Sequence, residues 1–227
     1  MTERPSEFEY RIIEHKGSVA EIINPYLRCS YECRYCYCRA IRKNIREALG
    51  VGPLTKISNH SDLVIQLLRM NHVSQYAFLG TAVDPYPLWE ADLRITEALL
   101  TECSKSSRNI IIATKSTLIL RDLDILSKCR NSLVFISLAS MSKTWSERFE
   151  PLSPSPEDRL NIIKELSRRE IDVGLFLAPI IPGNNDKFDN LCHLVEVATS
   201  VGARFCIIGL ALSSTLKIPK KLDERWR

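Results

Sequence analysis

The 227-residue sequence contains no long hydrophobic run and no segment of low complexity. No apolar stretch approaches the roughly 18 residues that a membrane-spanning helix requires, so no association with a membrane is expected. The first ten residues are charged and lack the apolar core of a signal peptide. We therefore expect the protein to be cytoplasmic.

The sequence also lacks the pair of cysteine motifs that forms an ordinary zinc site. Zinc loops usually pair two Cys-x2-Cys halves a dozen or more residues apart, whereas four cysteines of this chain stand singly, at Cys103, Cys129, Cys192 and Cys206. Thiols stay reduced in the cytosol, so eight cysteines indicate metal binding and packing in place of a disulfide scaffold. The other four crowd into ten residues, at Cys29, Cys33, Cys36 and Cys38.

The first three of these crowded cysteines have the spacing C-x3-C-x2-C, with Tyr35 directly before the last. A loop this short can place three thiolates around one face of a four-iron cluster, which leaves one iron open to a small molecule. A structural zinc ion, the alternative, would close all four positions with protein ligands. Cys38 has three interpretations: a fourth ligand, a thiol near the reaction site, or a small buried side chain.

Length and charge set the organisation of the chain. It is long enough for one well-filled α/β domain and too short for two. We expect a core domain over residues 19–212, an N-terminal lead over 1–18 and a basic tail over 213–227. The net charge is +4 and the pI about 8.6, a basic excess that a nucleic-acid enzyme could use and that many other enzymes share.

Six apolar, β-branched runs alternate with helical patterns along the chain. The expected strands are 19–24, 75–81, 109–115, 132–140, 172–181 and 204–212. The expected helices are 61–73, 90–106, 120–129, 155–169 and 187–201, with a polar, partly helical insert over 39–61. Repeating βα units require a parallel sheet, and near-continuous apolar strands suit a sheet that is buried on both faces. A barrel and an open sheet both fit this pattern.

Polar residues follow the expected strands at their carboxyl ends, where the active sites of parallel α/β proteins form. The cysteines follow the first strand, the second ends in Thr81, the third in Lys115, and the fourth carries Ser137 near its end. Together these residues are expected to line one mouth of the sheet.

At this point the sequence resembles the radical S-adenosylmethionine (radical SAM) superfamily, and within it the branch related to spore photoproduct lyase. The resemblance covers roughly residues 19–210 in order. Besides the cysteines, it includes Asn24-Pro25-Tyr26, Thr81, Asp84-Pro85-Tyr86, Glu90, Thr114-Lys115-Ser116, Arg121-Asp122-Leu123-Asp124, Phe149-Glu150-Pro151, Ser155-Pro156, Arg159, Ala178-Pro179, Ile181-Pro182-Gly183 and Asn185-Asp186.

The resemblance implies a partial (β/α)6 barrel of the TIM type, with a [4Fe-4S] cluster on Cys29, Cys33 and Cys36. The open iron would chelate S-adenosylmethionine, whose reductive cleavage gives a 5′-deoxyadenosyl radical that abstracts hydrogen from a substrate. An electron donor such as a flavodoxin or ferredoxin would supply the electron. The residues that the resemblance places at the cofactor are Tyr35 at the adenine, Thr81 at the methionine amino end, Lys115 at its carboxylate and Ser137 at the ribose.

Further polar residues have two interpretations each. Asp84, Tyr86 and Glu90 would contact substrate or shape the loop at the mouth. Lys115 would reach solvent if it bound no anion. Glu150 and Arg159 are expected to form an ion pair that fixes a loop between two helices.

Departures from the resemblance limit what it implies about the substrate. The spore lyase has a hydrogen-donating cysteine immediately before the position of Thr81, where this chain has Gly80, so that repair reaction is not expected. The substrate stays unidentified, with a nucleic acid or a peptide as candidates, and the oligomeric state is unknown. The alternative to an enzyme is a non-catalytic iron–sulfur or zinc-binding module that interacts with nucleic acid.

Overall fold

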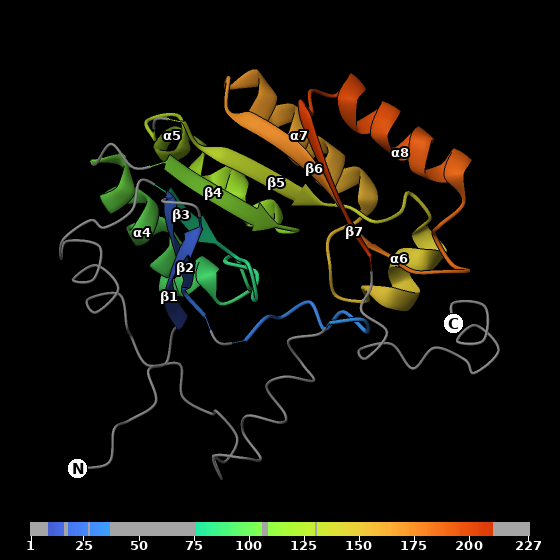
Figure 1. Ribbon diagram of the computed structural model, residues 1–227, viewed down its shortest axis with the longest axis horizontal. Helices are drawn as coiled ribbons and strands as arrows, with labels where there is room; N and C mark the ends of the chain where they lie inside the picture. The colour runs from blue at the N-terminus through green and yellow to red at the C-terminus, as the bar shows by residue number, and fades with distance from the viewer. Residues whose placement is uncertain are drawn as a thin grey trace, which may run out of the picture.

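The computed structural model describes residues 9–15, 18–26, 28–36, 76–105, 109–129 and 131–210. In this part of the chain, seven strands form one sheet in their sequence order (Figure 1). β1 (Glu9–His15) pairs antiparallel with β2 (Ser18–Asn24), and every later pair is parallel. The later strands are β3 (Tyr76–Leu79), β4 (Asn109–Thr114), β5 (Leu133–Ser137), β6 (Asp172–Ile180) and β7 (Phe205–Leu210).

In the described part of the chain, helices connect the parallel strands from β3 onward and lie around the outside of the curved sheet (Figure 1). They are α3 (Glu90–Leu93), α4 (Ile95–Ser104), the 3-10 helix η1 (Thr117–Asp122), α5 (Leu123–Leu126), α6 (Lys143–Phe149), α7 (Pro156–Arg168) and α8 (Phe188–Ser200). The six parallel strands β2 to β7 confirm the expected partial barrel and decide against a strand order that reverses in the middle of the sheet.

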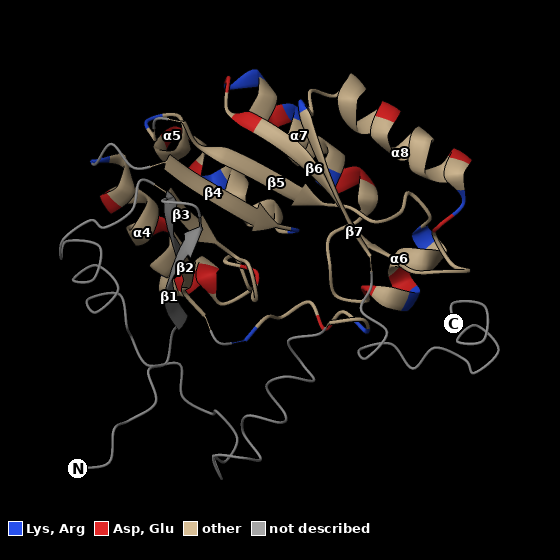
Figure 2. Ribbon diagram, in the orientation of Figure 1, with Lys and Arg blue, Asp and Glu red and all other residues tan. Residues whose placement is uncertain are grey.

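The core lies between the sheet and these helices. Strands β4 and β5 carry no charged residue, whereas Lys, Arg, Asp and Glu stand mainly on helices and loops (Figure 2). Helix α7 shows how the sequence sets this layer: Ser155 and Asp158 form a capping box at its start, with Pro156 in the first turn. Its Ile162, Ile163 and Leu166 are fully buried against the strands.

The structure differs from the sequence-based expectation at several elements. β1 lies within the expected N-terminal lead, and α6 lies in a stretch for which no helix was expected. The expected helix over 90–106 is divided at Arg94, whose φ is +52°, and the one over 120–129 is the 3-10 helix η1 followed by the short α5. The expected helix over 61–73, the insert over 39–61 and the tail over 213–227 lie outside the described residues.

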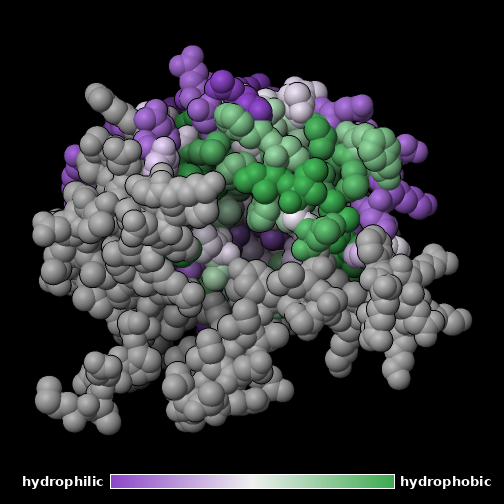
Figure 3. Space-filling model, viewed as in Figure 1, coloured by the Kyte–Doolittle hydropathy of each residue, from purple (hydrophilic) through white to green (hydrophobic). Residues whose placement is uncertain are grey.

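β7 forms one edge of the described sheet and exposes large apolar side chains. They form part of a hydrophobic area in the space-filling view and comprise Phe205, Ile207, Ile208 and Leu210 (Figure 3). None of the described helices has both the length and the apolar character needed to cross a membrane.

Candidate functional site

The cysteines stand on the segment that leaves the carboxyl end of β2, here called the cysteine loop (residues 25–36). On one side it is held by the segment that follows β3. Tyr26 Oη donates to the carboxylate of Glu90, and Tyr31 Oη donates to the carbonyl oxygen of Tyr86 at 3.0 Å. The backbone N–H of Leu88 in turn donates to Ser30 Oγ at 3.0 Å.

Asn24, the last residue of β2, ties the start of the loop to the same segment. Its Oδ1 accepts hydrogen bonds from the backbone N–H groups of Ala82 at 3.1 Å and Val83 at 3.3 Å. Its Nδ2 lies 3.5 Å from Thr81 Oγ1. The asparagine therefore satisfies backbone donors that would otherwise be orphaned in a turn at the mouth of the sheet.

The far end of the cysteine loop is held by α6 and the turn after it. The backbone N–H of Arg34 donates to the carbonyl oxygen of Phe149 at 2.8 Å, and Tyr35 Oη donates to the carboxylate of Glu150. The Tyr35 ring lies 6.2 Å from the ring of Trp145. The loop thus runs across the mouth from the β3 side to the α6 side (Figure 1).

The three thiols lie along this crossing. Cys33 is buried, with Sγ 3.9 Å from Ser153 Oγ, and Cys29 and Cys36 are partly buried. Burial and the nearby Asp84 carboxylate raise the pKa of the Cys29 thiol to about 12. Burial likewise raises the pKa of the Cys33 thiol, although the charge of Lys115 opposes the shift.

The donor atoms of the cysteine loop suit an iron–sulfur cluster. Three thiols on one short loop are the ligand type that iron–sulfur clusters take, and metal binding displaces thiol protons that burial otherwise retains. The residues therefore fit such a group by their chemistry. Among the described residues, no three His, Cys, Asp or Glu side chains are already gathered in a metal-binding arrangement. Cys38 lies outside the described residues.

Lys115 follows β4 and extends toward the cysteine loop. Its side chain is 16% exposed, and Nζ lies 4.0 Å from Glu150 Oε1 and 5.9 Å from the centroid of the Tyr35 ring. Burial disfavours its charge, but Glu150, Cys33 and Asp84 outweigh burial and raise the pKa of the ammonium group. Within the described part of the chain Nζ makes no hydrogen bond, and a lysine ammonium has three donors with which to bind an anion.

Glu150 and Arg159 form the buried ion pair that the sequence led us to expect. Arg159 Nη2 lies 2.5 Å from Glu150 Oε2, and both side chains are fully buried. Arg159 also donates from Nη1 to the carbonyl oxygen of Ser137 and from Nε to that of Pro154, each at 3.0 Å. Although burial alone would raise it, the pKa of Glu150 is lowered by the charges of Lys115 and Arg159.

The residues expected at the cofactor do not all lie together. Tyr35, Lys115 and Cys33 are brought together around Glu150. Thr81 is exposed and lies beside Asn24, at the β3 side of the mouth. Ser137, at the end of β5, is buried and has Oγ 3.5 Å from the carbonyl oxygen of Ala178.

Asp84 and Tyr86 have contacts that shape the loop after β3. Asp84 Oδ1 accepts from Thr114 Oγ1 at 2.7 Å and from the Tyr86 N–H at 3.0 Å, while Oδ2 accepts from the Lys115 N–H at 2.8 Å. The carboxylate therefore fixes the backbone from which the Lys115 side chain extends. Tyr86 is fully buried, and burial followed by the charge of Asp122 raises the pKa of its phenol.

Two residues of the site were missed by the sequence analysis. Trp145 packs against Tyr35 and Phe149, but its helix gave no recognisable sequence signal. Arg121 belongs to the motif Arg121-Asp122-Leu123-Asp124 of the resemblance, but the sequence suggested no role for it. In the structure its guanidinium group donates hydrogen bonds to the carboxylates of Glu90 and Asp122, next to the loop after β3.

Comparison with known proteins agrees with this geometry. The model of the radical SAM superfamily matches residues 23–195, and the chain therefore belongs to that superfamily. An uncharacterized protein of Methanocaldococcus jannaschii is 30% identical over 161 residues, which cover 71% of this chain and 60% of that protein. An uncharacterized protein of Mycobacterium tuberculosis is 25% identical over 203 residues, covering 86% of this chain and 60% of the relative. The chain thus spans about 60% of the length of these relatives.

Solved structures with the same fold carry little sequence identity. SuiB of Streptococcus suis bound to S-adenosylmethionine superimposes with a TM-score of 0.62 at 13% identity, covering 90% of this chain and 43% of SuiB. A spore photoproduct lyase variant with dinucleoside spore photoproduct gives a TM-score of 0.54 at 16% identity, covering 80% of this chain and 53% of the lyase. At such identities the likeness establishes the fold alone.

Proposed function

We propose that the protein is an enzyme that cleaves S-adenosylmethionine reductively and uses the reaction to abstract hydrogen from a nucleic acid or a peptide. The observation that carries this proposal is the position of Lys115. Its ammonium group lies within electrostatic reach of Cys29 and Cys33, on the loop that crosses the mouth, and makes no hydrogen bond among the described residues.

In this proposal Cys29, Cys33 and Cys36 hold a [4Fe-4S] cluster. With S-adenosylmethionine bound, such a cluster supplies the one-electron chemistry that breaks the sulfonium bond. Lys115 binds the methionine carboxylate of the cofactor through a charge-assisted hydrogen bond. Glu150 keeps Lys115 charged and near the thiols, while Arg159 neutralises the Glu150 carboxylate from the other side.

The other cofactor contacts are proposed from position. Thr81 faces the methionine amino end, Ser137 the ribose and Tyr35 the adenine. The ring of Tyr35 packs toward Trp145 and its hydroxyl bonds Glu150, so the backbone of this residue is the part left for the adenine. Tyr31 on the loop and Tyr86 beside it are both buried and exclude water from the inner side of the loop.

The nature of the substrate is the least specified part of the proposal. A macromolecular substrate is consistent with the basic net charge of +4. It is also consistent with the fold relatives, one of which has been solved with a precursor peptide and another with a dinucleoside photoproduct. A flavodoxin or ferredoxin is the proposed electron donor.

The deciding experiment is anaerobic reconstitution with iron and sulfide, followed by reduction in the presence of S-adenosylmethionine. We expect about four irons per chain and formation of 5′-deoxyadenosine. Alanine at Cys29, Cys33 or Cys36 should abolish both, whereas Cys38→Ala should retain both. Zinc in place of iron, or a cluster without 5′-deoxyadenosine, would instead support the non-catalytic module.

A further inference from the structure

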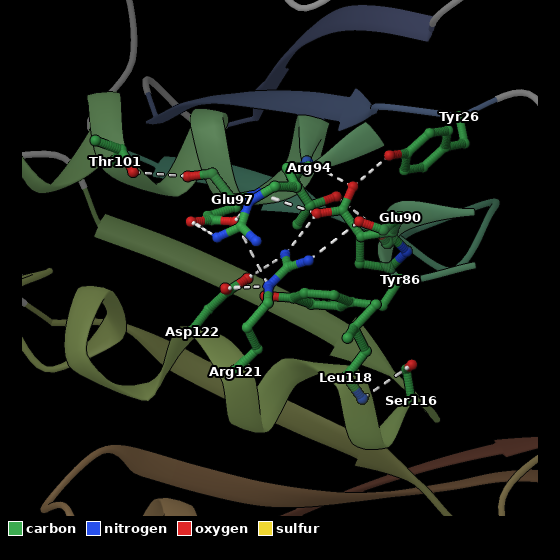
Figure 4. A network of polar contacts seen from close by, with 12 residues as sticks. Tyr26, Tyr86, Glu90, Arg94, Glu97, Thr101, Ser116, Leu118, Arg121 and Asp122 are labelled. Carbon is green, nitrogen blue, oxygen red and sulfur yellow. Dashed lines mark hydrogen bonds and ion pairs between the residues drawn. The ribbon is translucent and has the colours of Figure 1, made fainter. Parts of the chain in front are cut away.

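Glu90, the first residue of α3, contacts α4, η1 and the start of the cysteine loop (Figure 4). Its Oε2 accepts hydrogen bonds from Tyr26 Oη and from the Thr96 N–H at 3.0 Å. Its Oε1 accepts from the Glu97 N–H at 3.2 Å and from Arg121 Nη2 at 2.7 Å. The side chain is fully buried, and each oxygen already has two donors.

Helix α4 and η1 hold this carboxylate in place. Arg94, at the start of α4, has a φ of +52° and makes no side-chain cap, so Glu90 satisfies the N–H groups of the first turn instead. The amino-terminal end of a helix favours a negative charge, and Arg121 supplies a full positive charge from η1. Arg121 is in turn fixed by Asp122 at 2.7 Å, so the acceptor for Tyr26 has a defined position.

Tyr26 connects this carboxylate to the thiols. It lies three residues before Cys29, its side chain is only 4% exposed, and its ring meets that of Trp89 edge to face at 6.4 Å. Burial and the Glu90 carboxylate raise the pKa of the Tyr26 phenol, which keeps the hydroxyl a hydrogen-bond donor. The bond between Tyr26 and Glu90 therefore fastens the loop close to its first thiol.

We propose that Glu90 is a positioning residue that acts through Tyr26 to fix the amino-terminal half of the cysteine loop and thereby the place of Cys29. Glu90 is thus an internal acceptor and not a ligand for substrate. The consequence for a cluster rests on the proposed function, but the positioning of the loop itself does not.

The test uses the alkylation rate of each thiol in the metal-free protein, measured with iodoacetamide and peptide mass spectrometry. In Tyr26→Phe and in Glu90→Gln we expect Cys29 to react about tenfold faster than in the parent, the factor that corresponds to about 1.4 kcal/mol of easier local opening. The rate at Cys36 should change much less, because Arg34 and Tyr35 still hold the far end.

Three controls separate positioning from general destabilisation. Cys103 and Cys129, 2% and 5% exposed in the core, are internal references that should stay unreactive in every variant. Tyr35→Phe should give the opposite pattern, with Cys36 accelerated more than Cys29. Lys105→Gln removes an exposed ion pair with Glu102 on α4 and should leave all rates unchanged.

A double variant tests whether Tyr26 and Glu90 act through one bond. Because the Tyr26 hydroxyl bonds Glu90, both single changes weaken the same contact, and Tyr26→Phe with Glu90→Gln should accelerate Cys29 by less than the product of the two single effects. Unchanged Cys29 rates in both single variants would overturn the proposal. Cys103 and Cys129 reacting in step with Cys29 would also overturn it, because Glu90 would then stabilise the whole fold and not the loop.

A second readout uses the reconstituted protein at a temperature where all variants are folded. We expect Tyr26→Phe and Glu90→Gln to lose iron to a chelator about tenfold faster than the parent and Lys105→Gln. If the parent takes up no cluster, the proposed function fails, and the alkylation pattern still decides the positioning of the loop.

Discussion

Gly80 has a φ of +85°, and its position leaves no room for a side chain. A Cβ there would lie 2.6 Å from Pro85 Cδ and closer still to the carbonyl oxygen of Ala113. Both the backbone conformation and the packing at the end of β3 therefore require glycine. The spore lyase places its hydrogen-donating thiol at the residue that we align with Gly80. In this chain the backbone conformation and the neighbouring atoms leave no space for a side chain at that position.

We expect Gly80→Ala to lower the free energy of unfolding by more than about 1 kcal/mol, because alanine is strained at positive φ and also meets Pro85. Gly209→Ala is the matched control, since the added Cβ would lie 3.0 Å from the Ala178 side chain and 3.9 Å from that of Phe176, with no backbone atom within 4 Å, and the φ is not positive. Urea unfolding at pH 7 measures both. An equal loss in the two variants would contradict this account of Gly80.

Lys115→Ala should weaken S-adenosylmethionine binding about tenfold or more while the cluster is retained, because a charge-assisted hydrogen bond contributes roughly 1.5 to 3 kcal/mol. Ser137→Ala should lower the affinity less, since a neutral hydroxyl contact is nearer about 1 kcal/mol. Lys105→Ala, which removes an exposed lysine, is the control. Calorimetry on the reconstituted protein measures the affinities, and an unchanged value in Lys115→Ala would mean that this lysine binds no carboxylate.

At the scale of elements, the buried pair of Glu150 and Arg159 joins the turn after α6 to α7 and the end of β5. Removing one partner leaves the other charge uncompensated in the interior. We therefore expect Glu150→Gln or Arg159→Met to lower the free energy of unfolding by about 3 to 5 kcal/mol. Glu165→Gln, which breaks an exposed pair with Arg168 on the same helix, should change it by at most about 0.5 kcal/mol.

The stability difference between the parent and Glu150→Gln should depend on pH. The pKa of Glu150 is lower in the folded state than the ordinary value of about 4.3, so its ionised form stabilises the fold above that value. This stabilisation is lost as the pH falls through the folded-state pKa. Urea unfolding from pH 7 down to about pH 3 should show the difference shrinking, and a constant difference would contradict an ionised Glu150.

The sequence predicted the repeating elements well and the irregular ones poorly. The parallel strands were recognisable because runs such as Ile110 to Ala113 are apolar throughout, and Ser155 and Pro156 marked the start of α7. β1 was not recognised, because charged residues interrupt its apolar pattern and it pairs on one side only. α6 is seven residues long and mostly polar, too short for a helical period to stand out.

The site shows the same division. The spacing of the cysteines and the strand-end position of Lys115 could be read along the chain. The bond between Tyr26 and Glu90 joins residues 64 positions apart, and that between Tyr35 and Glu150 residues 115 apart. Such pairs depend on how the strands are ordered, and no local pattern indicates them.

At the scale of the whole molecule, membership of the radical SAM superfamily does not carry the reaction of any one member. We expect the reduced protein with S-adenosylmethionine to leave spore photoproduct in DNA largely unrepaired, even if it forms 5′-deoxyadenosine as proposed, because Gly80 supplies no thiol and its positive φ and packing disfavour a side chain. The measurement is the number of restored thymines per 5′-deoxyadenosine. Near-stoichiometric restoration would contradict this prediction, and loss of that repair in Cys38→Ala would identify Cys38 as the donor.

The attachment of the cysteine loop to both sides of the mouth makes the arrangement of its thiols depend on the completion of folding. One end depends on α3 and the loop after β3, and the other on α6 and the turn that leads into α7. A nascent chain that has emerged only as far as β4 has the thiols but not the second attachment. If the cysteines hold the proposed cluster, we expect stable metal insertion only after α6 and the turn that follows it have been synthesised and have packed against the loop.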